Sequence, residues 1–122
     1  AVGPSMLKLF KAIYDAGFTR IPGTDGLAGY MLHHELELYA EAGIPPAEVL
    51  RMATLTPALV MGVDKDRGVI QAGKLADMVL VDGDPTKNMS DIRNVSTVLK
   101  GGNVYDPAAI ESSLGIQPRT SH

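Results

Sequence analysis

The sequence predicts an α/β chain in two parts that meet near residue 62. In the first part apolar residues recur at the spacing of a helix, beginning with Met6, Leu9, Phe10 and Ile13. After Gly62 this spacing stops, and residues 78–81 form a continuous apolar run of strand length. The pair Gly101-Gly102 then divides two further apolar segments, as in a two-residue β-hairpin. We therefore expect helices and one strand, followed by an antiparallel meander.

The first helix is expected to begin with Ser5 as its N-cap and to end at Gly17, because glycine readily takes the left-handed conformation of a C′ residue. Residues 18–23 are typical of a short extended segment. Residues 32–42 predict a second helix, with Gly43 as its stop signal.

Prolines mark the next two helices. Pro46 suits the first position of a third helix that continues over residues 47–53, because that position needs no backbone N–H. Thr56 followed by Pro57 predicts the start of a short fourth helix that ends at Gly62.

The second part is predicted to be mainly β structure. Strands are expected at residues 68–70, 78–81, 95–100 and 103–105, with a polar loop over residues 85–91. From Pro107 onward the sequence predicts an irregular segment.

Composition excludes several classes of function. The chain has 122 residues, a formal net charge of -3 and 45% hydrophobic residues, so it suits a globular domain and has no basic excess for nucleic acid. No apolar run approaches the ~20 residues that span a bilayer, so no membrane partner is expected. The chain has no cysteine, which excludes a thiolate nucleophile.

The candidate catalytic residue is Asp25, within Gly23-Thr24-Asp25-Gly26 at the end of the first extended segment. An aspartate at the carboxyl end of a parallel strand points into the crevice where α/β enzymes carry out their chemistry. An isolated Asp-Gly pair is more often a simple turn, so both interpretations stand on this motif alone. Thr24 could orient Asp25 by a hydrogen bond or could be a plain loop hydroxyl.

The charged residues of the predicted helices favour structural roles. His33 and His34 are adjacent, so they point about 100° apart on a helix and cannot grip one metal ion as an i, i+4 pair could. We expect His34 to be solvated. Glu35, Glu37 and Glu48 stand early in their predicted helices, where the helix dipole favours negative charge.

Several motifs follow one another in a fixed order. They are Gly23-Thr24-Asp25, residues 32–38, residues 42–50, Ala53-Thr54, Thr56-Pro57-Ala58, residues 73–77 and Asp82-Gly83-Asp84-Pro85. This order resembles the C-terminal part of the amidohydrolase superfamily of metal-dependent hydrolases. It is most similar to the branch with imidazolonepropionase-like and Xaa-Pro dipeptidase-like enzymes, and the resemblance covers roughly residues 5–106.

The resemblance implies an α/β fragment, because a complete (β/α)8 barrel needs about 250 residues. Residues 1–62 would be the last strand and helices of the barrel. Residues 63–106 would be the C-terminal antiparallel strands of a small β-sandwich, with residues 107–122 as an irregular tail. Lys74 and Asp77 would fix a turn that enters the strand at residues 78–81.

The resemblance also implies a chemistry. Asp25 would bind a divalent metal ion, with zinc the expected ion, and would exchange a proton with the attacking water. The complete enzyme would hydrolyse a C–N bond of a small-molecule substrate, such as an amide, a cyclic amide or a dipeptide. The family's other metal ligands are missing from this chain, so we expect no tight metal binding and no catalysis by the chain alone. The alternative is a non-catalytic module that self-associates, as a homo-oligomer or by domain swapping through an exposed barrel seam.

Overall fold

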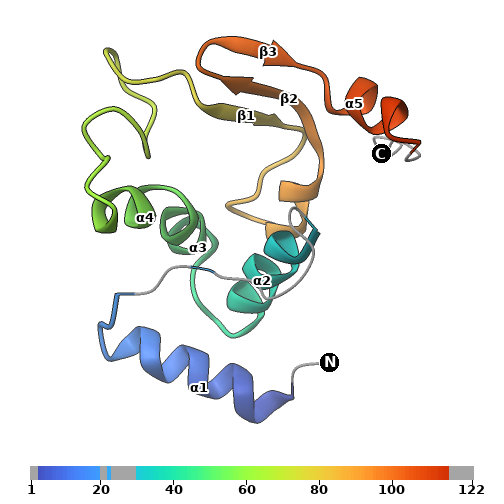
Figure 1. Ribbon diagram of the computed structural model, residues 1–122. Coiled ribbons are helices and arrows are strands. Elements are labelled where there is room, and N and C mark those ends of the chain that lie inside the picture. Colours follow the sequence, from blue (N-terminus) through green and yellow to red (C-terminus); the bar gives the residue numbers. More distant parts are fainter. Residues whose placement is uncertain (1–2, 20–21, 23–29, 116–122) are drawn as a thin grey trace.

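The computed structural model describes residues 3–19, 22 and 30–115 (Figure 1). The first part of the chain contains α1 (Pro4–Asp15), α2 (Tyr30–Glu41), α3 (Pro46–Ala53) and α4 (Leu55–Val60). The second part contains β1 (Met78–Val81), the 3-10 helix η1 (Met89–Arg93), β2 (Val95–Lys100), β3 (Asn103–Tyr105) and α5 (Pro107–Ser113). Helices followed by strands confirm the predicted change of structure along the chain.

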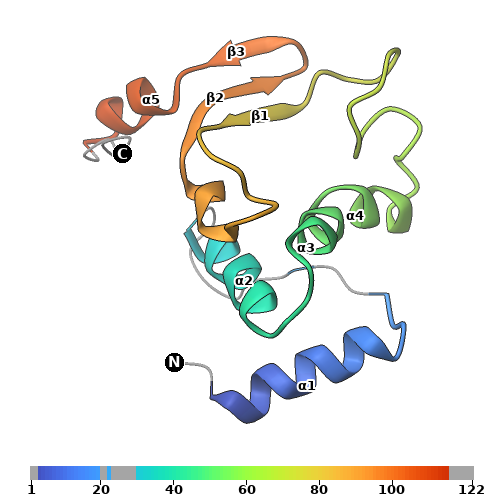
Figure 2. The ribbon, with the colours of Figure 1, turned by 180° about the vertical axis from the view of Figure 1, so that it is seen from behind.

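The three strands form one antiparallel sheet in the order β1-β2-β3, which confirms the predicted meander. Met78 pairs with Leu99, and Val98 pairs with Tyr105, while the register between β1 and β2 shifts between Leu80 and Val81. In both ribbon views the sheet lies on one side of α2, α3 and α4, and α1 lies on the other (Figures 1 and 2).

The core lies where the two parts of the chain meet. Its buried residues come from α2, from the α2–α3 turn, from α3 and from η1, and they are Leu36, Ile44, Val49, Met52 and Met89. Ile44 and Val49 are 1% and 0% exposed. Met89 belongs to the second part of the chain and is 4% exposed. The helices and η1 therefore share one core.

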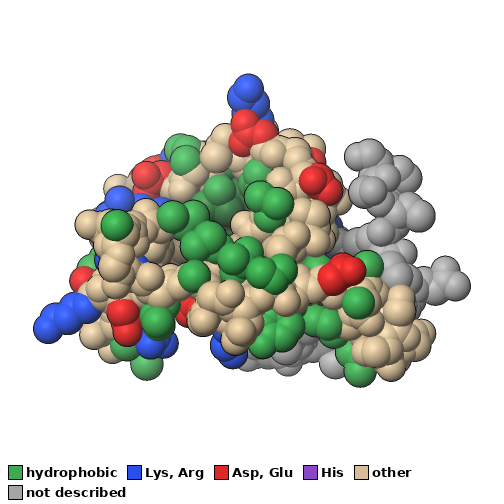
Figure 3. All heavy atoms as spheres, turned by 90° about the horizontal axis from the view of Figure 1, so that it is seen from above, with side chains coloured by type: hydrophobic (Ala, Val, Ile, Leu, Met, Phe, Trp, Pro, Cys, Tyr) green, Lys and Arg blue, Asp and Glu red, His purple; other side chains and the backbone are tan. Residues whose placement is uncertain are grey.

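Large apolar side chains remain exposed outside this core. Ile70, Met61 and Val104 are 81%, 74% and 70% exposed. Figure 3 shows hydrophobic side chains gathered on the face that carries the sheet. The exposed residues of β1 and β3 include Val79, Leu80, Val104 and Tyr105.

Glycine and proline signals located several helix boundaries correctly. Gly17 follows α1 with φ +81°, and its N–H donates to the carbonyl of Tyr14. Pro46 opens α3 at the predicted position. Gly62, with φ +72°, follows the last turn of α4. Each glycine takes a left-handed conformation that other residues rarely adopt.

Two predicted helix caps were wrong. Ser5 lies inside α1, because Pro4 takes the first helical position and Gly3 is the N-cap. Helix α4 begins at Leu55 rather than at Thr56, so Pro57 falls in the first turn, where a missing N–H breaks no helical hydrogen bond. The Thr54 hydroxyl donates to the Leu50 carbonyl at 2.8 Å and closes α3.

Two predictions for the second part were also wrong. Residues 68–70 form a bend and irregular structure instead of a strand, because the loop closes on itself through a hydrogen bond from the Leu75 N–H to the Asp66 carbonyl at 2.7 Å. Residues 107–113 form α5 instead of an irregular segment, because Asp106 accepts a hydrogen bond from the Ala108 N–H at 3.0 Å and Pro107 opens the helix.

Candidate functional site

The predicted catalytic residue, Asp25, lies outside the described residues, as do Thr24 and Gly26. The structure describes the two helices on either side of this segment. Their facing side chains include Phe10 of α1 and Tyr39 of α2, whose rings meet edge to face with centroids 5.7 Å apart. The extended segment predicted at residues 18–23 is described only at Phe18, Thr19 and Pro22, which have no regular secondary structure.

The two histidines of α2 differ in exposure. His33 is half-buried, and His34 is exposed, as expected for a solvated residue. Within the described ranges, no three histidine, aspartate or glutamate residues gather in a way that could hold a metal ion. A structural transition-metal site normally uses four protein ligands and a catalytic site three. The described residues therefore do not form a metal centre by themselves.

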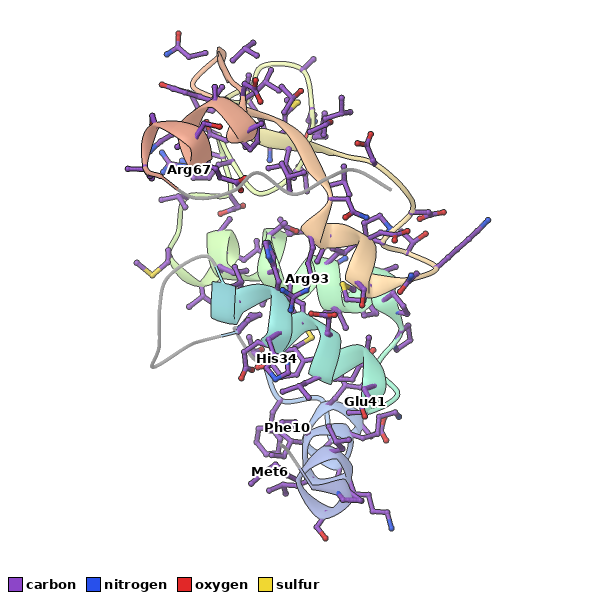
Figure 4. The ribbon with its side chains drawn as sticks, turned by 90° about the vertical axis from the view of Figure 1, so that its right-hand side faces the viewer. Met6, Phe10, His34, Glu41, Arg67 and Arg93 are labelled. Carbon is purple, nitrogen blue, oxygen red and sulfur yellow. The ribbon has the colours of Figure 1, made fainter. Side chains whose placement is uncertain are left out.

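Glu37 makes the most extensive polar contact that the structure describes between distant segments. Its Oε2 accepts a hydrogen bond from the Ser90 hydroxyl at 2.6 Å, and its Oε1 accepts from Arg93 Nε at 2.7 Å. Arg93 Nη2 donates to the same Oε1, which makes the contact an ion pair. Figure 4 shows Arg93 at the junction of η1 with α2. One carboxylate thus joins two residues of η1 to α2.

The helix-dipole interpretation of Glu35 and Glu37 was wrong. Helix α2 begins at Tyr30, and its first turn contains no acidic residue. Glu37 instead binds Ser90 and Arg93 of η1, which are 53 and 56 residues away in the sequence. Glu48 does lie in the first turn of α3, as predicted.

The environment of Glu37 favours its charged form. Burial disfavours the charge, but the hydrogen bonds from Arg93 and Ser90, together with the electrostatic interactions with Arg93 and His34, outweigh this effect. The pKa of the Glu37 carboxyl is therefore lower than its ordinary value. Glu37 stays ionised near neutral pH and is not a general acid there.

Lys74 and Asp77 have structural roles, as expected, but their described partners lie in other segments and not in a turn that enters β1. Lys74 Nζ donates to the Asp64 carbonyl at 2.6 Å. Asp77 Oδ1 accepts from the Gly101 N–H at 2.8 Å, which ties the start of β1 to the β2–β3 turn. Both side chains are engaged with the backbone, so their role in this structure is conformational.

The segment Asp82-Gly83-Asp84-Pro85 shapes the loop that presents η1. The Asp84 N–H donates to Asp91 Oδ2 at 2.9 Å. Gly83 lies so close to Asp91 that a Cβ at residue 83 would be 2.5 Å from the same oxygen. The Thr86 hydroxyl and N–H both donate to Asp84, and these hydrogen bonds lower the pKa of Asp84. The motif therefore builds a closed loop.

A hollow of about 220 Å³ lies between the C-terminal end of α1 and helices α3 and α4. Its described lining residues are Tyr14, Gly17, Phe18, Thr19, Met52 and Thr56. Neither a carboxylate nor an imidazole occurs among them. The hollow thus offers apolar contact and hydroxyl groups from its described residues.

The sequence model of the amidohydrolase family matches residues 4–105 of this chain. This chain belongs to the amidohydrolase family. An adenine deaminase of Cereibacter sphaeroides is 33% identical over 87 residues, which cover 71% of this chain and 14% of that protein. The imidazolonepropionase of Shouchella clausii is 39% identical over 62 residues, which cover 48% of this chain and 14% of that protein. The amidohydrolase chain therefore spans a small share of the length of these relatives.

Solved structures agree with this assignment. The crystal structure of a Xaa-Pro dipeptidase with bound methionine in the active site matches 87% of the amidohydrolase chain and 27% of its own, with a TM-score of 0.78 and 30% identity. A putative prolidase from Bifidobacterium longum matches 90% and 30%, with a TM-score of 0.73 and 28% identity. The helices and the antiparallel sheet of this chain thus correspond to part of the amidohydrolase fold.

Proposed function

We propose that this chain forms the C-terminal part of a metal-dependent amidohydrolase that hydrolyses a C–N bond in a small substrate, such as an amide, a cyclic amide or a dipeptide. The family match over residues 4–105 carries this proposal, because it includes the Asp25 motif and the loops that follow it. Similar proteins are named as deaminases and as a dipeptidase, and these reactions break C–N bonds.

We assign residues 1–62 to the end of a (β/α)8 barrel and residues 63–106 to part of a small β-sandwich. Two observations support the assignment. The first is the similarity to solved amidohydrolase-type structures over most of the chain. The second is the change from helices α1–α4 to the sheet β1–β3 after residue 62.

Asp25 is assigned as a metal ligand and as the proton carrier of the reaction. Asp25 would hold a divalent metal ion, with zinc the expected ion, and the bound metal would make hydroxide available near neutral pH by lowering the pKa of water. The Asp25 carboxylate accepts a proton from the attacking water and passes it to the departing nitrogen. Because the described residues hold no metal site of their own, the other ligands must come from elsewhere in the complete enzyme.

The substitution Asp25→Asn tests this assignment in the full polypeptide as its host expresses it. Hydrolysis of a panel of N-acyl amino acids, cyclic amides and dipeptides is followed with and without added zinc. We expect kcat to fall by about 10²–10⁴-fold, the range for loss of a general acid–base group. The control is Asp82→Asn, which makes the same chemical change on an exposed loop. Equal activity of the two variants would contradict the role of Asp25.

A second candidate function is a non-catalytic, self-associating module. The exposure of Ile70, Met61, Val104 and Phe18 favours it, because exposed apolar surface promotes association. Sedimentation velocity of the 122-residue chain over a wide concentration range tests this candidate. A homo-oligomer or a domain-swapped dimer would support it, and a monomer at all concentrations would contradict it.

A further inference from the structure

The described elements form two groups. We call α1, α2, α3 and α4 the helical unit, in which each helix packs against the next. We call β1, β2, β3, η1 and α5 the sheet unit, in which β2 contacts β1, β3 and α5, and η1 contacts β1. Among the described elements, the two units meet most extensively where α2 packs against η1. In both ribbon views η1 lies beside α2 (Figures 1 and 2).

The chain that connects the units, residues 61–77, passes close to the helical unit at Gly68. A Cβ at this residue would lie 2.8 Å from the Ala58 Cβ. The far end of the connection is tied to the sheet unit, since the Gly102 N–H donates to the Ala76 carbonyl at 3.3 Å. The connection therefore contacts both units, and the α2–η1 contact is a second link between them.

The α2–η1 contact has an apolar and a polar half on neighbouring residues. Leu36 of α2 and Met89 of η1 are buried in the same core. Glu37, the next residue of α2, binds Ser90 and Arg93 of η1. The two donors are three residues apart, so one carboxylate fixes both the position and the rotation of η1.

The pair of charges is largely shielded from solvent. The side chains of Arg93 and Glu37 are 21% and 25% exposed. Removing one member of such a pair leaves the other charge partly desolvated, which costs more than the loss of an exposed pair. The contact is therefore sensitive to the loss of the charge at residue 37.

Hydrogen bonds hold the loop of η1 to the sheet unit, so a contact at Glu37 also connects α2 to the strands. The Asp82 N–H donates to the Asn94 carbonyl at 2.9 Å, which closes the loop that carries η1. Inside this loop, Asn88 Oδ1 accepts from the Ser90 N–H at 3.3 Å, and Asp91 binds the Asp84 N–H. Hydrogen bonds thus fix the loop that carries η1 to the ends of β1 and β2.

We propose that the Glu37 carboxylate, with Ser90 and Arg93, is a coupling device that makes the helical unit and the sheet unit open together. The buried Met89 gives the junction its apolar contact, and Glu37 makes it specific in orientation. Without the charge at residue 37, the sheet unit opens more readily than the helical unit. The proposal concerns this chain alone and holds whether or not Asp25 is catalytic.

Native-state amide hydrogen exchange measured by NMR tests the proposal on the 122-residue chain. The reporters are the N–H groups of Thr97 and Leu99 in β2, and those of Val49 and Met52 in α3. In the unsubstituted chain we expect both groups to exchange through the same opening. In the Glu37→Gln variant we expect the amide protection factors of β2 to fall at least about tenfold relative to those of α3.

The matched control is Glu41→Gln, which removes the same charge from an exposed residue one turn further along α2. It should leave the ratio of β2 to α3 protection unchanged. If Glu37→Gln does not fold, Ser90→Ala removes one donor from the same carboxylate and should show a smaller split in the same direction. Equal loss of protection in β2 and α3, or independent opening of the units in the unsubstituted chain, would overturn the proposal.

Discussion

Truncation of Met89 should destabilise the chain far more than truncation of Met61. Met89 is 4% exposed and packs in the core with Leu36, Ile44, Val49 and Met52. Met61 is 74% exposed after the end of α4. The two substitutions to alanine remove the same atoms, so the difference between them reports the environment of each side chain.

The magnitude follows from burial. A buried methionine replaced by alanine costs about 2–5 kcal/mol, through lost transfer free energy and the cavity left behind. Replacing an exposed methionine by alanine changes the free energy of unfolding by no more than about 0.5 kcal/mol. Since a domain of this kind is stable by about 5–15 kcal/mol, Met89→Ala should remove a large part of the stability.

Urea unfolding followed by far-ultraviolet circular dichroism measures both variants. Met89→Ala should lower the urea midpoint strongly at an unchanged m value, and Met61→Ala should leave it nearly unchanged. Equal midpoints for the two variants would refute the placement of η1 in the shared core.

Three further predictions concern local features. The free energy of unfolding of Gly68→Ala should be lower than that of Gly73→Ala by about 1–3 kcal/mol, because both residues have positive φ but only Gly68 would place a Cβ 2.8 Å from Ala58. Thermal melts of the two variants measure this difference. Equal melting temperatures would contradict the prediction. The pKa of Glu37 is lowered in the folded chain, so its contribution to stability is complete above the unfolded-state pKa of about 4.3 and is lost as the pH falls through the folded-state value. The difference in urea midpoint between the unsubstituted chain and Glu37→Gln should therefore shrink in acid. A constant difference from pH 7 to pH 3 would be inconsistent with this. Asp106→Ala removes the N-cap of α5 and should cost about 1 kcal/mol; amide exchange of α5 should rise, with no change expected in α3.

The predictable part of the fold depends on local signals. The β2–β3 hairpin follows from Gly101-Gly102, whose φ values of +58° and +82° suit glycine. The spacing of apolar residues predicts the helices, and glycine and proline predict where the helices begin and end. The same local chemistry also marks α5, since Asp106 before Pro107 is a cap followed by a proline at the first helical position. This signal was present but was outweighed by the irregular composition of the following residues.

The contact of Glu37 with η1 could not be predicted from the sequence. Ser90 and Arg93 lie more than 50 residues further along the chain, and no periodic pattern connects them to α2. On the sequence alone, Glu37 looks like any other acidic residue of a solvated helix. Likewise, residues 68–70 have the composition of a strand, but none of the described strands pairs with them to accept their backbone hydrogen bonds.

The approach of Gly83 to Asp91 limits how this segment can vary among related sequences. A side chain at residue 83 would meet the Asp91 carboxylate, and the φ of +112° at Gly83 disfavours any L-residue there. The two positions should therefore change together in evolution, with glycine lost only where a shorter side chain replaces Asp91 and the loop takes another path. A library that randomises both positions and selects for folded chains should recover glycine with aspartate far more often than either residue alone.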